Sequence, residues 1–428
     1  MNQGVGSAGL VDVLRSLIAD DSSAGFAGTH LILLLRIANL DKLGFIHGFE
    51  YTQSLSGRLS KLLKTQLRDR DSVHRIGDRD IGVVLPGVAS ASILGLAVNK
   101  INTILSDYSQ TAGAGAHFRV YIGASVFPRH GEDARELYRS AYLAMLCAER
   151  GCLDFLEYSA ENRRIIQREV DIEEELLKSV GNYEFELFYQ PQLDLESGKI
   201  TSAEVLLRWN SARLGFVPPD LFIPIAEKNG LINDITEWII QKALNFHSEF
   251  FSAGHEFNLA INLSPVNLKD RSLPDFIEQS LGVWGVPASR LTLELTEGAM
   301  LDQPAQARDM LEQLKSLGVT LSIDDFGTGY SSLQYIGDLP VDELKIDKSF
   351  ILDMATNEKN RRIVKSVLDL AKNFDLDVVA EGVEDDLTMA SLKQMGCNKA
   401  QGYCISRPLS EANFRQYVSA RNDADPLR

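Results

Sequence analysis

From residue 185 onward, strand-like and helix-like stretches alternate, and this restricts the fold more than any other feature of the chain. We expect strands at 185–195, 201–208, 257–263, 291–296, 319–324, 343–347, 377–381 and 399–404, separated by amphipathic helices such as 233–250, 304–317 and 358–373. Eight strands alternating with helices over roughly 240 residues are typical of a (β/α)₈ barrel. Only the short turn LESGK separates the first two strands, so we expect one antiparallel strand and hence a modified barrel.

The first part of the chain follows the pattern of a smaller α/β domain. Its expected strands are 29–37, 81–86 (closed by Pro86) and 118–128, and its expected helices are 10–19, 50–68, 90–106 and 133–149. The charged helical stretch 161–180 contains the boundary. We therefore expect a first domain at 1–165, a helical linker at 166–178, a barrel domain at 179–420 and a tail at 421–428.

The charge of the chain is uneven, which limits its partners. Residues 1–165 hold 18 basic and 17 acidic side chains, whereas residues 166–428 hold 25 and 42. An acidic bulk repels polyanions, so we expect no nucleic-acid polymer as a partner. A phosphorylated ligand would need metal ions or a few well-placed basic groups.

The sequence predicts a cytoplasmic protein that does not bind membranes. The most apolar short stretch, 31–35, is too short to cross a bilayer, and the N-terminus lacks a basic region. Residues 1–28 are too few for a sensory domain. The four cysteines form no CxxC pair, which argues against a disulfide scaffold or a structural zinc site.

Polar side chains lie at the ends of the expected barrel strands, where barrel enzymes carry their catalytic groups. They are Glu204, Asn262, Glu294, Glu297, Asp324, Asp325, Lys345, Glu381 and Gln401. Carboxylates gathered at one mouth would repel one another unless cations neutralised them. Carboxylate and amide oxygens, with no histidine after His255, favour Mg²⁺ or Mn²⁺ over zinc or copper.

Strand alternation sharpens this prediction. Glu204, Leu206 and Arg208 should share one face of their strand, where the planar guanidinium suits a phosphate. Lys345 and Asp347 should share a face by the same rule.

Two adjacent aspartates need an interruption of their strand. Asp324 and Asp325 cannot both face inward from a regular strand, so we expect a break supplied by Gly327 and Gly329. Such a carboxylate pair suits a two-metal hydrolase. Taken singly, each polar residue could be a solvated loop residue or a cap, and Asn262 before Ser-Pro could be turn chemistry. Nine of them at successive strand ends argue against that alternative.

These motifs point to a family. The second half resembles the EAL-type cyclic di-GMP phosphodiesterases from YQP near 189 to RPL near 407, above all in DDFGTGYSSL and LKIDKSFI. The tripeptide that names the family is here EVL, at 204–206, and its Val205 faces away from Glu204. The resemblance implies a modified (β/α)₈ barrel with one antiparallel strand.

The resemblance also implies an activity, hydrolysis of cyclic di-GMP to the linear dinucleotide pGpG with two Mg²⁺ or Mn²⁺ ions per active site. One ion would be held by Glu204, Asn262, Glu294 and Asp324, and the second by Asp324, Asp325 and Glu381. A water between the ions would attack phosphorus. The residues implied in catalysis are Glu204, Lys345, which would hold or polarise the water, Glu381, and Gln401, which would orient water.

Further residues take implied roles outside the metal centre. Those similar to contacts with the substrate's phosphate and bases are Gln190, Leu206, Arg208 and Glu384. Glu297 is similar to the glutamate that anchors the DDFGTGYSS loop. A homodimer through the barrel domain is also implied.

The first half resembles a GGDEF (diguanylate cyclase) domain with an altered signature. The chain has GDRDI at 77–81, with Asp78 in place of the second glycine and Arg79 in place of the metal-binding acid. We therefore expect no cyclase activity from this degenerate GGDEF domain.

The other cyclase positions are altered as well. The second metal-binding aspartate corresponds to Arg36 or Ala38, and the pair that contacts guanine corresponds to Gly44-Phe45. We expect the domain to serve as a regulatory or dimerising platform, with a regulatory protein or a nucleotide as a possible partner.

One motif of the cyclase family survives, since Arg68 and Asp71 have the spacing of its inhibitory site for cyclic di-GMP. A surface charge run is the favoured alternative. For the whole chain, the alternatives to an active phosphodiesterase are a non-catalytic cyclic di-GMP receptor, an interaction scaffold and an aldolase-like barrel enzyme. Intact ligands and an intact DDFGTGYSS motif favour the enzyme over the receptor.

Overall fold

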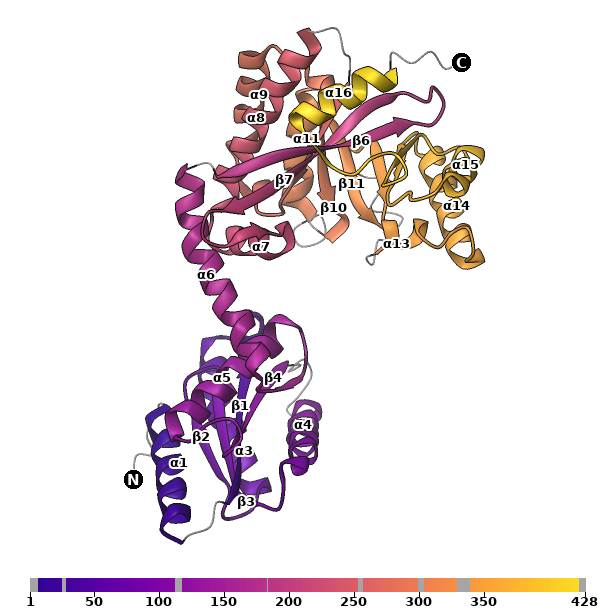
Figure 1. Cartoon of the computed structure of the whole chain (residues 1–428). Helices are drawn as coiled ribbons and strands as arrows, with labels where there is room; N and C mark the ends of the chain where they lie inside the picture. The colour runs from indigo at the N-terminus through magenta and orange to yellow at the C-terminus, as the bar shows by residue number, and fades with distance from the viewer. Residues whose placement is uncertain are drawn as a thin grey trace. The chain divides into compact units, whose positions relative to one another are not determined.

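A computed structural model describes residues 7–24, 28–111, 118–182, 184–252, 257–298, 304–328 and 339–422. The chain divides into two compact units, Met1–Val170 and Asp171–Arg428, whose elements are labelled in Figure 1. Among the described residues, no helix combines the length and apolar character needed to cross a bilayer.

The first unit is a five-stranded sheet covered by helices on both faces. Its strands, in the order β2-β3-β1-β4-β5, are β1 (Thr29–Ile37), β2 (Ser72–Arg75), β3 (Asp80–Val88), β4 (Val120–Phe127) and β5 (Phe155–Glu157). The helices are α1 (Ser7–Ala24), α2 (Leu40–His47), α3 (Phe49–Gln66), α4 (Leu94–Thr111) and α5 (Ala134–Arg150). This confirms the expected smaller α/β domain.

The apolar sequence of strand β1 reflects its position, because both faces of this strand are buried. Ile32 and Leu34 belong to a core with residues of α1 and α5, whereas Leu31 and Leu33 belong to a second core with residues of α3 and α4. Gly123 in β4 allows α5 to approach closely, since a Cβ atom there would lie 2.1 Å from the backbone nitrogen of Met145.

The first unit differs from the expectations in one strand end and in three elements that were not predicted. Strand β3 does not end at Pro86 but continues to Val88, because its pairing with β1 shifts register between Thr29 and Leu31 and accommodates the proline there. Strands β2 and β5, of four and three residues, and helix α2 were not predicted at all. Elements this short carry too few residues for a detectable period.

The second unit is the expected barrel. Its eight strands are β6 (Phe185–Asp194), β7 (Ile200–Ser211), β9 (Asn258–Leu263), β10 (Leu291–Thr296), β11 (Thr320–Phe326), β12 (Glu343–Ile346), β13 (Asp377–Ala380) and β14 (Lys399–Gln401). Strand β6 pairs antiparallel with both β7 and β14 and so closes the barrel, while the other neighbours run parallel. The antiparallel strand predicted from LESGK is therefore confirmed. Two further short strands, β8 (Gly215–Val217) and β15 (Leu409–Ser410), pair antiparallel with β7 and β6 respectively.

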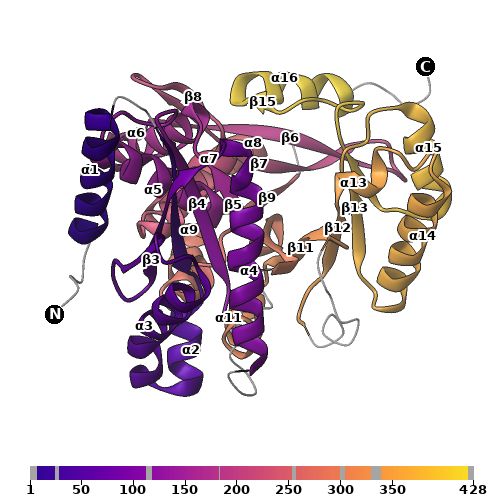
Figure 2. The same cartoon turned by 90° about the horizontal axis from the view of Figure 1, so that it is seen from below.

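Amphipathic helices surround the barrel. They are α7 (Pro219–Lys228), α8 (Ile232–Ser252), α9 (Leu273–Trp284), α11 (Pro304–Ser316), α13 (Lys348–Ile351), α14 (Glu358–Asn373), α15 (Asp386–Met395) and α16 (Glu411–Asn422). Figure 2 shows α14 on the outer side of β12 and β13, against which it packs. The apolar side chains between strands and helices form one continuous core.

Helix α6 (Ala160–Asn182) contains the whole of the expected linker 166–178. Its residues Ile172 and Leu176 are buried in the core of the second unit. The C-terminal half of this helix is therefore part of the barrel unit's own packing. Most of the expected tail 421–428 lies outside the described residues.

Candidate active site

Lys345 of β12 lies at the centre of a ring of carboxylates at the carboxyl ends of the barrel strands. Its Nζ atom is 2.7 Å from Glu294 Oε2, 2.8 Å from Glu381 Oε1, 3.2 Å from Asp324 Oδ1 and 3.8 Å from Glu204 Oε2. The lysine side chain has no exposed surface. Four acids from four segments of the chain therefore meet around one buried cation.

The ring carries more negative charge than Lys345 can balance. Burial raises the pKa of Glu294 well above its ordinary range; Lys345 opposes this shift, whereas Glu204 and Asp324 add to it. Burial likewise raises the pKa of Glu381 to about 7. Burial alone would lower the pKa of Lys345, but the surrounding carboxylates together raise it well above the ordinary value. Additional cations would stabilise the ionised acids.

The donor set fits hard divalent cations. The carboxylate oxygens of Asp324, Asp325 and Glu381 lie within 4.8 Å of one another. Glu294 Oε1 is buried and has no hydrogen-bond partner in the part of the chain that the structure describes, so it is a free acceptor inside the ring. Oxygen-only donors of this kind are those that Mg²⁺ and Mn²⁺ prefer.

A bulge in β11 presents the two neighbouring aspartates. Between Ile323 and Phe326 the register with β12 shifts, and Asp325 has a φ of 55°. The interruption thus begins at Asp325, and Gly327, directly after the end of β11, also has a positive φ, as expected; Gly329 lies outside the described residues. Burial, and then repulsion from Asp324 and Asp347, raise the pKa of Asp325.

Glu204 is held by amide groups on both of its oxygens. Asn262 Nδ2 donates to Glu204 Oε1 at 2.7 Å, and Gln401 Nε2 donates to Oε2 at 2.6 Å. Gln401 also donates to Gln190 Oε1 at 3.2 Å. A close backbone approach supports this wall, because a Cβ atom on Gly402 would lie 2.2 Å from the carbonyl oxygen of Val383.

A cavity of about 460 Å³ opens beside the ring. Six of the predicted residues line it: Gln190, Glu204, Asp324, Glu381, Glu384 and Gln401. The sequence analysis missed its other lining residues, Lys348, Leu352, Gly382, Gly402 and Tyr403. Lys348 and Tyr403 lie two residues after the ends of β12 and β14. The criterion used for the other residues, a polar side chain near the end of a strand, would therefore also have identified these two. The guanidinium of Arg407 lies 4.2 Å from the Tyr403 ring centroid.

The remaining predicted residues lie near this ring or anchor its loop. Arg208 is half-buried, with its guanidinium 5.8 Å from the Phe188 ring, and Leu206 pairs with Phe188 across β6 and β7. Glu297 Oε2 accepts a hydrogen bond of 3.0 Å from the backbone of Gly327, at the start of the DDFGTGYSSL loop. The loop from Gly329 onward lies outside the described residues.

Asp347, which was expected to share a face with Lys345, lies one residue past the end of β12, and its charge contributes to the raised pKa of Asp325. It follows the last residue of β12 and accepts a 3.0 Å hydrogen bond from the backbone of Ser349, so it caps α13.

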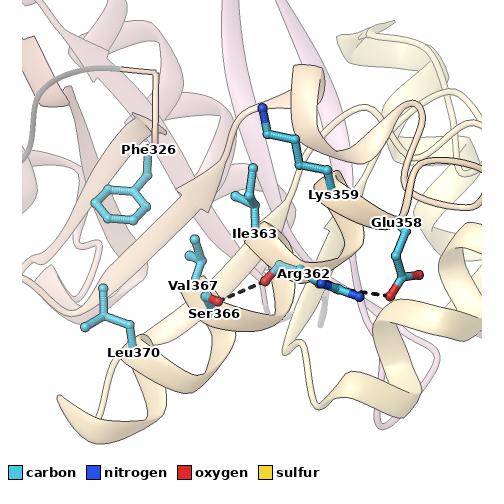
Figure 3. Close-up of a pocket in the computed structure, with 8 residues that line it drawn as sticks. All are labelled: Phe326, Glu358, Lys359, Arg362, Ile363, Ser366, Val367 and Leu370. Carbon is cyan, nitrogen blue, oxygen red and sulfur yellow. Dashed lines mark hydrogen bonds and ion pairs between the residues drawn. The ribbon is translucent and has the colours of Figure 1, made fainter.

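A second, more apolar groove of about 630 Å³ lies along α14. Figure 3 shows its lining, which comprises Phe326 from the end of β11 and, from α14, Glu358, Lys359, Arg362, Ile363, Ser366, Val367 and Leu370. Within the helix, Arg362 Nε donates to Glu358 at 3.3 Å and Ser366 Oγ donates to the carbonyl oxygen of Arg362 at 2.9 Å. This groove lacks the convergent acids of the ring and is not the candidate active site.

In the first unit, Arg36, one of the two residues expected at a metal-ligand position (the other is Ala38), is held by acids. Arg36 bonds both carboxylate oxygens of Asp80, at 2.9 and 2.8 Å, and its Nη1 bonds Glu149 at 2.9 Å. In the hairpin between β2 and β3, Arg79 pairs with Asp41 at 2.6 Å. The cyclase signature is therefore occupied by internal ion pairs.

The structure also describes the position expected to contact guanine and the two residues of the expected inhibitory site. Phe45 is 95% exposed. Asp71 is 5% exposed, and its Oδ2 accepts a 3.0 Å hydrogen bond from the backbone of Arg68, so its carboxylate is committed to its own turn. Asp71 is therefore a buried acceptor within this turn, and the inhibitory site at Arg68 and Asp71 stays a prediction.

Comparison with known families assigns both units. The EAL domain profile matches residues 173–408, and the diguanylate cyclase, GGDEF domain profile matches residues 21–151. The chain is 33% identical over 404 residues to cyclic di-GMP phosphodiesterase NbdA of Pseudomonas aeruginosa, covering 92% of this chain and 51% of NbdA. It is 30% identical over 380 residues to the bifunctional diguanylate cyclase/cyclic di-GMP phosphodiesterase MucR of the same species, covering 88% and 55%. The chain thus spans about half the length of these curated relatives.

Solved structures show the same likeness. The PaMucR phosphodiesterase in complex with c-di-GMP is 36% identical, with a TM-score of 0.55, and covers 57% of this chain and 99% of that one. The EAL enzyme Bd1971 in its cGMP-bound form is 25% identical, with a TM-score of 0.58, and covers 92% and 95%. The chain therefore belongs to the EAL domain family and carries a GGDEF domain before its EAL domain.

Proposed function

We propose that the barrel unit is a cyclic di-GMP phosphodiesterase that depends on Mg²⁺ or Mn²⁺ and releases pGpG. The observation that carries this proposal is the convergence of Glu204, Glu294, Asp324 and Glu381 around Lys345, beside a cavity lined by Gln190 and Glu384. The match to the EAL domain, and the relatives named as cyclic di-GMP phosphodiesterases, support the choice of substrate.

The residues would act as follows. Glu204, Asn262, Glu294 and Asp324 would hold one ion, and Asp324, Asp325 and Glu381 the other. Bound ions would lower the pKa of a water and offset the charge on the phosphate. The oxygen of water forms a bond to phosphorus, and the 3′-oxygen leaves with a proton, so one water is consumed per bond cleaved.

The other side chains would position the reactants. Lys345 provides a fixed positive charge beside the attacking water, and Gln401 orients Glu204 and that water. Arg208, Leu206, Gln190 and Glu384 would contact the phosphate and bases of the substrate. Glu297 would hold the loop that carries the two aspartates through its bond to Gly327.

The test is hydrolysis of cyclic di-GMP by the purified chain with Mg²⁺ or Mn²⁺, beside a Glu204→Ala control. We expect linear dinucleotide from the wild type and none from the variant. Binding of cyclic di-GMP without turnover would make the chain a receptor instead. If the chain neither binds nor hydrolyses cyclic di-GMP, the interaction scaffold becomes the favoured function.

We further propose that the first unit has no cyclase activity, because Arg79 and either Arg36 or Ala38 stand where metal-binding acids are expected, and both arginines are paired with acids. Incubation with GTP and Mg²⁺ should yield no cyclic di-GMP. Formation of product that is abolished by Asp80→Asn would overturn this. A regulatory protein or nucleotide remains the expected partner of this unit.

Three broader expectations also remain proposals: the domain boundaries, a homodimer through the barrel unit and a cytoplasmic location. Limited proteolysis followed by mass spectrometry tests the boundaries. Light scattering tests the dimer, and fractionation of cells that produce the full-length protein tests the location.

A further inference from the structure

We propose that Gln192 and Ser202 are positioning residues, which fix the side-chain amide of Gln401 so that its N–H group donates to Glu204. The inference rests on the proposed function only in taking Glu204 as a metal ligand. Neither Gln192 nor Ser202 was expected to serve the site.

A continuous chain of short hydrogen bonds joins these residues. Ser202 Oγ bonds Gln192 Oε1 at 2.6 Å, and Gln192 Nε2 bonds Gln401 Oε1 at 2.8 Å. Gln401 Nε2 then bonds Glu204 Oε2 at 2.6 Å. Ser202, Gln192 and Gln401 are 3%, 1% and 4% exposed, so water has little access to replace these bonds.

The strand register brings the chain together. Gln192 of β6 pairs with Ser202 of β7 on one side and with Gln401 of β14 on the other. The hydrogen-bond chain therefore crosses the barrel where its antiparallel strand closes it, and it ends at the carboxylate of Glu204.

The donor and acceptor of every bond in this series follow from the residue at its end, Glu204. An ionised Glu204 can only accept, so Gln401 must present its N–H group and turn its carbonyl to Gln192. Gln192 must then donate to Gln401, which leaves its own carbonyl facing Ser202, and Ser202 must donate.

A second branch imposes the same orientation. Gln190 Nε2 donates to the backbone carbonyl of Ser406 at 3.3 Å, which turns Gln190 Oε1 toward Gln401. Gln401 therefore has to donate to Gln190 as well. Two branches agree on one orientation of a single amide, and the opposite orientation would place its carbonyl against the carboxylate of Glu204.

The consequence is a Glu204 side chain with a fixed plane. Gln401 binds one of its oxygens and Asn262 the other, so the remaining lone pairs keep a constant direction. Removing the donor on Gln192 leaves the buried carbonyl of Gln401 without a partner and allows the amide to rotate. Substituting a residue that orients a metal ligand in this way commonly lowers metal affinity or activity by about 10–100-fold.

A structural role alone makes a different prediction. If the hydrogen-bond chain merely ties β6 to its neighbours, its loss should lower stability and leave metal affinity unchanged. Gln241 offers a matched control, because it donates to Ser280 at 2.7 Å and accepts from Trp284 at 2.8 Å on the outer helices. Gln241→Met loses two side-chain bonds without touching the ring of acids.

The experiment measures Mn²⁺ affinity by calorimetry and thermal unfolding in EDTA, using the full chain. Gln192→Met should weaken Mn²⁺ binding about 10–100-fold, whereas Gln241→Met should lower the unfolding temperature without changing affinity. Ser202→Ala should weaken binding less, and Ser202→Thr, which keeps the hydroxyl, should restore it. If Gln192→Met does not fold, the comparison of Ser202→Ala with Ser202→Thr tests the proposal on its own.

Unchanged Mn²⁺ affinity in both Gln192→Met and Ser202→Ala would overturn the proposal, and so would a wild type that binds no Mn²⁺. Hydrolysis assays separate this result from the proposed activity. A wild type that binds Mn²⁺ without cleaving cyclic di-GMP would refute the activity, while a loss of affinity in Gln192→Met would still support the positioning role.

Discussion

The ammonium of Lys345 donates to Glu294 at 2.7 Å, and neither side chain has any exposed surface. Removing the cation by Lys345→Met should leave several buried carboxylates without a counter-charge. We expect the free energy of unfolding, measured in EDTA, to fall by about 3–5 kcal/mol, and hydrolysis to be lost. Mn²⁺ should recover part of the stability, because it can neutralise the same acids. Equal stability of both proteins in EDTA would contradict this account.

Asp325 combines a positive φ with a raised pKa, so its carboxylate is held at a cost to stability. Asp325→Asn tolerates the same backbone conformation and removes the repulsion from Asp324. We expect a higher unfolding temperature in EDTA but weaker Mn²⁺ binding and slower hydrolysis. Asp325→Ala serves as the control, because it also removes the charge but strains the backbone. It should not gain stability, and an equal gain in both variants would argue against backbone strain.

His247 gives the barrel a dependence on pH. Its side chain is buried and Nε2 lies 2.8 Å from the carbonyl oxygen of Phe257. Burial, and to a smaller extent Arg290, lower the pKa of His247 below the ordinary value, although the bond to Phe257 opposes this. The unfolded chain therefore takes up a proton more readily than the folded one, and stability falls as the pH drops below about 6.5.

The change in unfolding temperature between pH 7.5 and 5.5 tests this prediction. His247→Gln can keep a donor toward Phe257 but does not titrate in this window. Its unfolding temperature should vary less with pH than that of the wild type. Parallel curves for the two proteins would mean that other groups cause the dependence.

Arg36 should be a main stabiliser of the first unit. It bonds Asp80 and Glu149, and these acids would face each other without a cation in Arg36→Met. We expect the free energy of unfolding of this unit to fall by about 1.5–3 kcal/mol. Calorimetry of the full chain can follow the transition of each unit. Arg58→Met, which removes an exposed arginine that stacks on Tyr51 at 4.5 Å, is the control and should change much less.

Long periodic elements were the most predictable part of the fold. The strands at 29–37 and 291–296 have the predicted bounds, because the first holds a continuous apolar run and the second alternates apolar with polar residues, and both patterns are typical of strands. Strand β14 is shorter than expected and ends at Gln401, since the chain turns to contact Val383. That turn depends on tertiary packing, which no local pattern reports.

The ring of acids was predictable because each member is a charged residue within or directly after an otherwise apolar barrel strand. The central place of Lys345 was not, since a sequence shows that a lysine ends a strand but not that four carboxylates surround it. The roles of Gln192 and Ser202 were invisible for a related reason. Their importance comes from pairing across β6, β7 and β14, which joins residues more than 200 positions apart in the case of Gln192 and Gln401.

The ion pairs of Arg36 also bear on how this chain could evolve. A guanidinium stays charged at any physiological pH, and here it serves two acids from separate segments. Replacing it with an aspartate would put a third negative charge beside Asp80 and Glu149, while Arg79 would still occupy the signature hairpin. Regaining a cyclase centre would therefore require several substitutions at once, with unstable intermediates between them. On the proposed absence of cyclase activity, these ion pairs therefore oppose a single-step return to a metal-binding centre.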